Sequence, residues 1–352
     1  MRLPTDLYLA GAAAWLPPAV SAKQVAANGG YSEEELTANG IVCAPEGTDS
    51  PPEMAARAAA TALSRSPGVT SEDIALVLHA HSHHQGQAFW SPASYVAREI
   101  GVTGAVAVNI GQMSNSGMAA LELALPYLAA RPGAAALVTA ADRFRAPSFD
   151  RWSADLGIVY GDGAAALVVS GGGGFAKVLS MRTRTDPSLE RLHRGNVPFT
   201  DHAGAEPVNV RRTKVEYVTE VGLPSIIERS TAGVMSVVSG ALADAGLGMD
   251  QMAVVVLPNL GRHVLAAQYL QHLELTPERT LMDWTAHTGH LGGGDQLAAV
   301  ARLVETKRVS AGQHVLLVGA GGGFSWSAAV VEVLEVPDWP EQTAMPELPA
   351  DV

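Results

Sequence analysis

Short apolar runs alternate with helical patterns along almost the whole chain, and this alternation limits the possible folds more than any other feature. The predicted strands cover residues 7–14, 74–79, 106–109, 134–140, 163–170, 252–257, 280–284, 315–319 and 327–334. The predicted helices cover residues 50–63, 91–100, 116–130, 224–245, 262–273 and 295–304. Such repeated alternation predicts an α/β fold, in which helices cover a central sheet.

Two pairs of similar segments indicate an internal duplication. The segment Ile-Ala-Leu-Val-Leu-His-Ala at 74–80 resembles Met-Ala-Val-Val-Val-Leu-Pro at 252–258, and the segment at 161–169 resembles that at 321–331. We therefore expect two domain-sized halves, an N-terminal one over 1–174 and a C-terminal one over 223–336. Residues 175–222 hold few apolar runs and are predicted to be an insertion or linker. The proline- and acid-rich residues 337–352 are predicted to be a loosely ordered tail.

The charge balance and the cysteine count argue against several functional classes. The chain has 352 residues and a formal net charge of −12, which argues against nucleic acid or an anionic membrane as the main partner. No apolar run approaches the ~20 residues that cross a bilayer, and Pro4 and Asp6 interrupt any signal-peptide core. The single cysteine, Cys43, rules out an intrachain disulfide, so we expect a cytoplasmic protein.

Ser114 lies in a short polar turn between an apolar run and a helical pattern, at the expected N-terminus of a helix. Unpaired backbone N–H groups and the helix dipole favour negative charge at such a position. The same placement would lower the pKa of a thiol, but a serine hydroxyl gains far less from it. A nucleophilic Ser114 therefore needs a base from elsewhere in the chain.

Five motifs carry a resemblance to a known family. They are Met-Ser-Asn-Ser-Gly at 113–117, Tyr-Gly-Asp-Gly-Ala-Ala-Ala at 160–166, Leu-Pro-Asn-Leu-Gly at 257–261, Thr-Gly-His-Leu-Gly-Gly at 288–293 and Gly-Ala-Gly-Gly-Gly-Phe-Ser-Trp at 319–326. In this order they resemble the thiolase superfamily, in particular ketoacyl-ACP synthase III enzymes. The resemblance implies a thiolase-like fold of two βαβαβαββ halves, a five-layer αβαβα arrangement and a homodimer. It also implies CoA or phosphopantetheine thioesters, carried by coenzyme A or acyl carrier protein, as substrates, with no tightly bound cofactor.

The chain departs from the usual pattern of this family at three positions. Ser114 replaces the family's cysteine, Asn259 stands at the histidine position, and His290 stands at the asparagine position. Asp295 follows at the head of a predicted helix. The set resembles ketosynthase III-like acyltransferases of polyketide and antibiotic biosynthesis, such as the starter-unit priming enzyme of anthracyclines, which carry a Cys/Ser–His–Asp set.

The resemblance predicts a catalytic triad of Ser114, His290 and Asp295. His290 would accept the serine proton, and Asp295 would fix the imidazole tautomer and stabilise its positive charge. The competing interpretations are an inert serine, natural or engineered, a core histidine whose hydrogen bonds are satisfied internally, and an aspartate that only caps its helix.

Further residues are predicted to bind the acyl group. An oxyanion hole is expected from the backbone N–H of Ser114 and from the loop of Gly322, Gly323 and Phe324. Asn259 either hydrogen-bonds the thioester carbonyl or caps the helix after Pro258. Phe89 or Trp90 is expected at the dimer interface, where an aromatic side chain reaches into the partner's acyl tunnel; the alternative is ordinary core packing.

Two charged or polar clusters remain. Arg211, Arg212 and Lys214 are predicted to contact the phosphates of coenzyme A or phosphopantetheine, or an acidic carrier protein, unless they form a solvated surface run. The His-Ala-His-Ser-His-His segment at 79–84 resembles a metal-binding segment, because its histidines alternate along the chain. No cysteine or carboxylate cluster accompanies it, so we predict no metal and a polar lining at a strand end beside the active site or the dimer interface.

The sequence leaves three functions open. The first is acyl transfer through an acyl-Ser114 to a carrier-protein thiol or a hydroxyl acceptor. The second is a decarboxylating ketosynthase III that primes a polyketide by condensing an acyl-CoA starter with malonyl-ACP. The third is a non-catalytic partner that only binds carrier protein.

Overall fold

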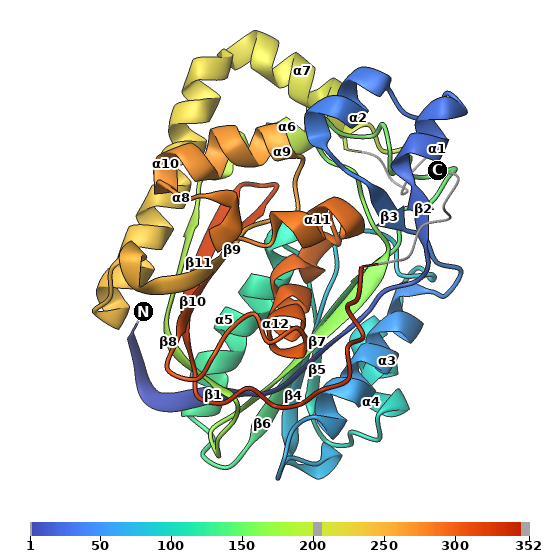
Figure 1. Ribbon diagram of the computed structural model, residues 1–352. Helices are drawn as coiled ribbons and strands as arrows, with labels where there is room; N and C mark the ends of the chain where they lie inside the picture. Colours follow the sequence, from blue (N-terminus) through green and yellow to red (C-terminus); the bar gives the residue numbers. More distant parts are fainter. Residues whose placement is uncertain (1, 200–205, 346–352) are drawn as a thin grey trace.

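Nine strands form one continuous mixed sheet in the computed structural model, which describes residues 2–199 and 206–345 (Figure 1). In spatial order they are β5 (Val106–Ile110), β4 (Ile74–Ala80), β6 (Ala135–Asp142), β7 (Gly163–Ser170), β1 (Arg2–Trp15), β8 (Ala176–Thr185), β11 (Ser325–Val333), β10 (His314–Gly321) and β9 (Met252–Val256). β4 runs parallel to β5 and β6, and β9 runs parallel to β10, whereas the other neighbours are antiparallel.

Helices flank this sheet and connect its strands. They are α1 (Ala22–Ala27), α2 (Glu33–Asn39), α3 (Pro51–Ser64), α4 (Pro92–Glu99), α5 (Ser116–Ala129), α6 (Arg191–Arg194), α7 (Val210–Val221), α8 (Leu223–Ala245), α9 (Arg262–Leu265), α10 (Gln271–Leu273), α11 (Met282–Thr288) and α12 (Asp295–Glu305). A small second sheet pairs β2 (Ala19–Ser21) with β3 (Cys43–Pro45). Of the helices within the described residues, none has the length and apolar character that a membrane span requires.

The two halves of the sheet repeat one topology. Outward from the central pair β1 and β8, the N-terminal half runs β1-β7-β6-β4-β5 and the C-terminal half runs β8-β11-β10-β9. Numbered by chain order, both halves place the first strand at the centre, followed outward by the last strand, the next-to-last strand and the second strand. The similar segments found in the sequence lie on equivalent strands, β4 with β9 and β7 with β11. The predicted duplication is thus confirmed.

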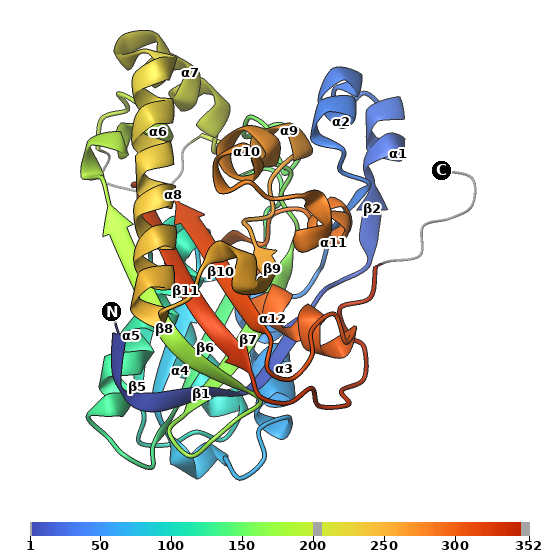
Figure 2. The same cartoon turned by 60° about the vertical axis from the view of Figure 1, so that its left-hand side comes forward.

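The helices and the two half-sheets stack in five layers, with the buried apolar side chains between them. α3 and α4 pack on the outer face of the N-terminal half-sheet. α5 and α12 fill the space between the half-sheets, where apolar residues of both halves meet them. α8 runs along β8 and β11 on the outer face of the C-terminal half-sheet (Figure 2). Helix, sheet, helix, sheet and helix therefore follow one another, as expected for a thiolase-like fold.

The prediction of a strand at 280–284 is wrong. This stretch is instead a 3₁₀ turn at Pro277–Arg279 followed by α11. Leu281, Trp284, Thr285 and Thr288 are all buried, and their spacing of three and four residues is that of one helix face. The C-terminal half consequently has no counterpart of the edge strand β5 among its described strands.

The predicted linker over 175–222 begins with a central strand rather than a connection. Its residues 176–185 form β8, which pairs with both β1 and β11. Arg182 and Arg184 alternate along β8 with less polar residues, and Arg182 forms an ion pair with Asp244 of α8. These charges conceal the apolar alternation in the sequence. The remainder contains α6 and α7, while residues 200–205 lie outside the described part of the chain.

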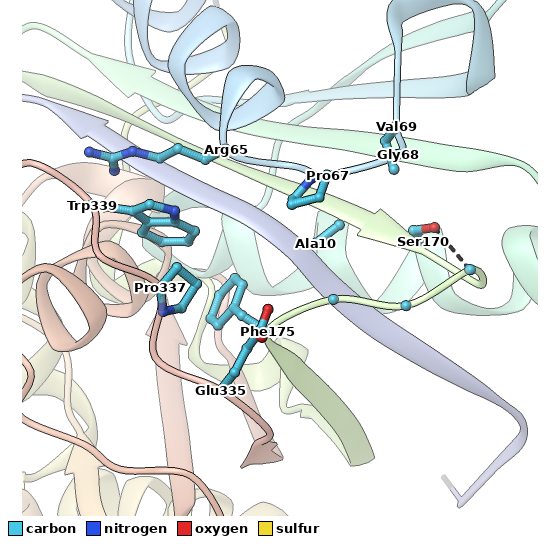
Figure 3. A pocket seen from close by; sticks show the side chains of 13 residues that line it. Ala10, Arg65, Pro67, Gly68, Val69, Ser170, Phe175, Glu335, Pro337 and Trp339 are labelled. Atoms are coloured by element: carbon cyan, nitrogen blue, oxygen red, sulfur yellow. Dashed lines mark hydrogen bonds between the residues drawn. The ribbon is translucent and has the colours of Figure 1, made fainter.

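The described part of the predicted tail packs against the sheet, unlike the loose segment expected. The Trp339 ring lies 5.1 Å from that of Phe175, and the Arg65 guanidinium lies 4.9 Å above it. Arg65 in turn forms a buried ion pair of 2.7 Å with Glu305, at the end of α12. A cavity of about 300 Å³ opens beside Trp339 and Phe175 (Figure 3). Residues 346–352 lie outside the described residues.

Candidate active site

Ser114 occupies a one-turn 3₁₀ helix, Met113–Asn115, between the end of β5 and the start of α5. This matches the turn predicted at a helix N-terminus. The first turn of α5 lies directly against the turn that follows His290, because a Cβ on Gly117 would lie only 2.1 Å from the Gly293 carbonyl oxygen. The glycine therefore brings the serine helix and the histidine loop together.

His290 is held through its backbone as well as its side chain. Its N–H donates to the Val159 carbonyl at 2.8 Å, and its carbonyl accepts from the Gly161 N–H at 2.9 Å. Gly161 permits this approach, since a Cβ there would lie 2.1 Å from the Thr288 carbonyl oxygen. The Tyr160 ring lies 5.2 Å from the imidazole. The Tyr-Gly-Asp-Gly motif of the N-terminal half thus positions the histidine of the C-terminal half.

Ser114, His290 and Asp295 form a continuous hydrogen-bonded chain. The serine Oγ lies 2.6 Å from His290 Nε2, and His290 Nδ1 lies 2.7 Å from Asp295 Oδ2. The backbone N–H groups of Leu291 and Asn259 each donate to the Asp295 carboxylate at 2.8 Å. Asp295 makes no side-chain capping bond to its own helix, so the helix-cap interpretation does not describe it. The geometry is that of a hydroxyl, a base and an orienting acid.

The electrostatic surroundings of His290 favour its protonated form. Burial lowers its pKa, but the charge and hydrogen bond of Asp295 oppose this, together with Asp155 and Asp142. The net effect raises the pKa of His290 above its ordinary value. An imidazole of this kind is a stronger base toward a serine hydroxyl.

The Asn259 side chain supports the turn before His290. Its Nδ2 donates to the Gly289 carbonyl at 2.9 Å and to Thr288 Oγ1 at 3.2 Å, and its Oδ1 accepts from Thr285 Oγ1 at 3.1 Å. Both ends of the amide are thus used within the protein. The side chain does not cap α9, whose N-cap is Gly261. Its amide also has no unused donor for a thioester carbonyl, because the Nδ2 group already makes two hydrogen bonds. The structure therefore supports neither of the two roles predicted for Asn259 from the sequence.

A cavity of about 380 Å³ adjoins the nucleophile turn. Its lining comes from the segments after β4 and β5, from the end of β8, and from the turn between β10 and β11 with the first residue of β11: His81, Ser82, Gly111, Gln112, Met113, Thr185, Gly322, Gly323, Phe324 and Ser325. The nucleophile turn, through Met113, and the predicted oxyanion loop thus line the same cavity.

The oxyanion candidates differ in whether their N–H groups are available. The Phe324 N–H donates to the Asp186 carbonyl at 3.2 Å and is therefore occupied. The N–H groups of Gly322 and Gly323 donate to no group in the described parts of the chain. Asn115 joins the nucleophile turn to the start of β11, directly after this loop, because its Nδ2 donates to Ser325 Oγ at 3.1 Å. Sequence reasoning missed Asn115, and no motif singles it out.

The histidine segment forms a polar wall beside the cavity. His79 is buried, with one ring nitrogen 2.9 Å from Thr139 Oγ1 and the other 2.9 Å from Gln85 Oε1. Asp142 accepts from Ser82 Oγ at 2.7 Å, and burial raises the pKa of Asp142 to about 7. Among the described residues, no group of three or more His, Cys, Asp or Glu side chains could hold a metal ion.

The predicted coenzyme-binding cations are mostly engaged within the protein. Arg211 pairs with Glu35 at 2.6 Å, and Lys214 pairs with the buried Asp155 at 2.5 Å. Arg212 is half exposed, and its nearest carboxylate oxygens lie 3.8 Å away. Arg212 is therefore the most available of the three for an anionic ligand.

The predicted interface aromatics lie outside the core. The Phe89 side chain is fully exposed, and Trp90 is 38% exposed and contacts Tyr95 edge-on. Val106 and Val108 of the edge strand β5 are 47% and 38% exposed. Ordinary packing inside one chain therefore does not account for Phe89.

Comparisons with sequence relatives agree on one kind of protein. Residues 242–333 match the family model of the 3-oxoacyl-[acyl-carrier-protein (ACP)] synthase III C terminal. A β-ketoacyl-[acyl-carrier-protein] synthase III of Rhodospirillum centenum is 26% identical over 280 residues, covering 78% of this chain and 82% of that protein. β-Ketoacyl-[acyl-carrier-protein] synthase III 2 of Streptomyces avermitilis is 28% identical over 290 residues, covering 81% and 84%.

Solved structures extend the comparison to most of the chain. The acyltransferase ChlB3 is 33% identical, with a TM-score of 0.88, over 95% of this chain and 99% of that one. The 3-oxoacyl-(acyl carrier protein) synthase III FabH of Pseudomonas aeruginosa shares the fold, with 20% identity and a TM-score of 0.77 over 94% and 99%.

Proposed function

The chain belongs to the ketoacyl-ACP synthase III-like enzymes of the thiolase superfamily, an acyl-transferring family, and from this premise we propose that it carries its acyl group on Ser114. The acyl group comes from a coenzyme A or acyl-carrier-protein thioester and passes to a carrier-protein thiol or a hydroxyl acceptor. The observation that supports this proposal most directly is the hydrogen-bonded chain from Ser114 Oγ through His290 to Asp295.

The first half-reaction acylates the enzyme. His290 Nε2 takes the proton of the Ser114 hydroxyl as Oγ attacks the thioester carbonyl, and Asp295 stabilises the imidazolium. The backbone N–H groups of Ser114 and of Gly322 or Gly323 stabilise the tetrahedral oxyanion. The carbon–sulfur bond then breaks, and the leaving thiolate takes the proton from His290 and departs as a thiol. An ester on Ser114 remains.

The second half-reaction repeats these steps with the acceptor. His290 removes the proton from the acceptor thiol or hydroxyl, which attacks the ester carbonyl of acyl-Ser114. Collapse of the intermediate breaks the bond to Oγ, and His290 returns the proton to the serine. The raised pKa of His290 supports its role as the base in both halves.

A second candidate function is decarboxylative condensation, which the names of the curated relatives favour. This reaction needs groups that stabilise the enolate formed from a malonyl thioester. Both ends of the Asn259 amide are hydrogen-bonded to the 285–289 segment. His290 is therefore the principal polar side chain left to stabilise the enolate. We therefore favour simple acyl transfer.

The proposed partners are acyl-CoA, acyl carrier protein and a second copy of this chain in the cytoplasm. The exposed aromatic Phe89 and the apolar edge strand β5 support a homodimer interface. Phe89 or Trp90 would then limit the acyl tunnel of the partner. The pathway that we propose is polyketide or antibiotic biosynthesis, and the 33% identity to ChlB3 supports the acyltransferase branch.

Product analysis tests this function. The protein is incubated with an acyl-CoA and one of three acceptors: a carrier protein in its thiol form, a sugar with a free hydroxyl group, or malonyl-ACP. Acyl transfer predicts an acylated acceptor without carbon dioxide release, and loss of the product in Ser114→Ala. Release of carbon dioxide with a β-ketoacyl product would support condensation instead. Absence of any product with all three acceptors would contradict both functions.

A further inference from the structure

A second imidazole lies beside the oxyanion loop. His193 belongs to α6, and a Cβ on Gly322 would lie 2.6 Å from its Nδ1. Its ring meets that of Phe324 nearly edge-on, with centroids 5.6 Å apart and planes at 85°. The glycine at 322 therefore leaves the space that the imidazole occupies. The loop that lines the cavity next to Ser114 is thus contacted by His193 as well.

The backbone around His193 is firmly held. Its N–H donates to the Glu190 carbonyl at 3.3 Å, and its carbonyl accepts from Thr213 Oγ1 of α7 at 3.1 Å. The same hydroxyl contacts the Leu192 carbonyl at 3.0 Å. The ring is consequently directed toward the loop by two packed helices.

Within the described residues, the side chain of His193, in contrast, makes no hydrogen bond. Its Nδ1 is buried without a partner. Buried polar atoms in folded proteins are almost always paired, because an unpaired one loses its hydration without compensation. Burial, aided by the nearby Lys214 charge, lowers the pKa of His193 to about 4. The imidazole is therefore neutral near pH 7 and can donate one hydrogen bond and accept another.

We propose that His193 is a substrate-binding residue whose imidazole hydrogen-bonds a polar group of the thioester held between Ser114 and the 322–324 loop. This inference rests on the proposed acyl transfer at Ser114. The ligand chemistry is an uncharged hydroxyl or amide, because the neutral ring offers no charge to an anion. Such a group is available from two sources, a hydroxyl on the acyl chain or an amide of the pantetheine arm.

Three donors separate these sources. S-Ethyl thiobutyrate has neither group, S-ethyl 3-hydroxythiobutyrate has only the acyl hydroxyl, and butyryl-CoA has only the pantetheine amides. The measured quantity is the second-order rate constant for acylation of Ser114, followed by intact-protein mass spectrometry. His193→Phe keeps a ring but removes both nitrogens. His193→Asn and His193→Gln restore an amide near the positions of Nδ1 and Nε2. His314→Phe, at the far end of β10, is the matched control.

We expect His193→Phe to slow acylation by at least tenfold with one of the two polar donors and by less than twofold with S-ethyl thiobutyrate. At least one amide variant should recover to within threefold of the wild type. Equal rates in His193→Phe and wild type for all donors would overturn the proposal. So would an equal loss with all three donors, or failure of both amide variants to recover, since each indicates a structural role. If the wild type accepts no donor at all, the proposed function fails instead.

Discussion

His290 is buried among carboxylates that raise its pKa, and this has a consequence for activity. The neutral imidazole is the form that accepts the serine proton, and it is lost as the pH falls through the raised pKa. We expect the acylation rate to fall on the acid side with a midpoint above 6.5, the ordinary value. Asp295→Asn removes the charge that raises the pKa, so the midpoint should move to lower pH and the rate should drop by ~10²–10⁴-fold.

The pH–rate profiles of wild type and Asp295→Asn provide this measurement. Glu341→Gln is a suitable control, because Glu341 is an exposed carboxylate that pairs with Arg302 at the surface. An unchanged midpoint in Asp295→Asn would contradict the account of the His290 environment.

Asn259 offers a second prediction for a single side chain. Asn259→Ala removes three hydrogen bonds to the 285–289 segment but keeps the backbone N–H that donates to Asp295. We expect the free energy of unfolding to fall by ~1–3 kcal/mol and acylation to slow through kcat. Denaturant unfolding and acylation kinetics check this result. An increase in KM with unchanged stability would indicate that Asn259 binds substrate directly.

At the scale of residues, the sequence predicts which side chains carry chemistry better than it predicts what supports them. The resemblance named Ser114, His290 and Asp295, and the structure brings them within hydrogen-bond distance. The partners of Asn259 and the surroundings of His193 depend on contacts between segments far apart in the chain. No local pattern encodes such contacts, so they could not be predicted.

At the scale of elements, the close approach of α5 to the Gly292–Gly294 turn brings Ser114 near His290. Gly117→Ala would place a Cβ 2.1 Å from the Gly293 carbonyl oxygen and force the two elements apart. We expect the free energy of unfolding to fall by ~1–3 kcal/mol and acylation to slow more than tenfold.

Gly171→Ala is the matched control for this prediction, because its Cβ would meet only an ordinary contact at 3.9 Å. Thermal unfolding and the acylation rate are measured for both variants. A Gly117→Ala protein with wild-type activity would show that the spacing of these elements does not govern the reaction.

The errors in element prediction have physical causes. The apolar residues around 281–288 are few and mixed with polar ones, so the sequence does not display the helical spacing of α11 clearly enough to distinguish it from a short strand. In β8, arginines on the exposed face broke the apolar alternation. Elements with long, uninterrupted apolar patterns, such as β7 and α3, were placed within one residue of their observed bounds.

At the scale of the whole molecule, the apolar edge strand β5 and the exposed Phe89 predict association of two chains. We expect sedimentation or light scattering to give twice the chain mass of 36.5 kDa. Val108→Lys should shift the protein toward monomer, because it places a charge on the exposed face of β5. The matched change Val215→Lys, on the exposed side of α7, should not do so. A monomeric wild type would contradict the dimer.

The duplicated architecture was predictable because equivalent strands of the two halves keep similar sequences, as β4 and β9 do. The continuity of the sheet through β1 and β8 was not predictable, because β8 lay in the presumed linker. The duplication matters for function, since the nucleophile comes from one half and its base and acid come from the other. Ser114 and His290 are 176 positions apart in the chain.

The central claim is that Ser114 carries the acyl group, and the most direct measurement is the mass of the protein after brief incubation with acyl-CoA and acyl-carrier-protein donors. The account predicts a mass increase equal to one acyl group, located by peptide mapping on Ser114 and absent from Ser114→Ala and His290→Ala. No acyl adduct with any donor, or an adduct that persists in Ser114→Ala, would contradict it.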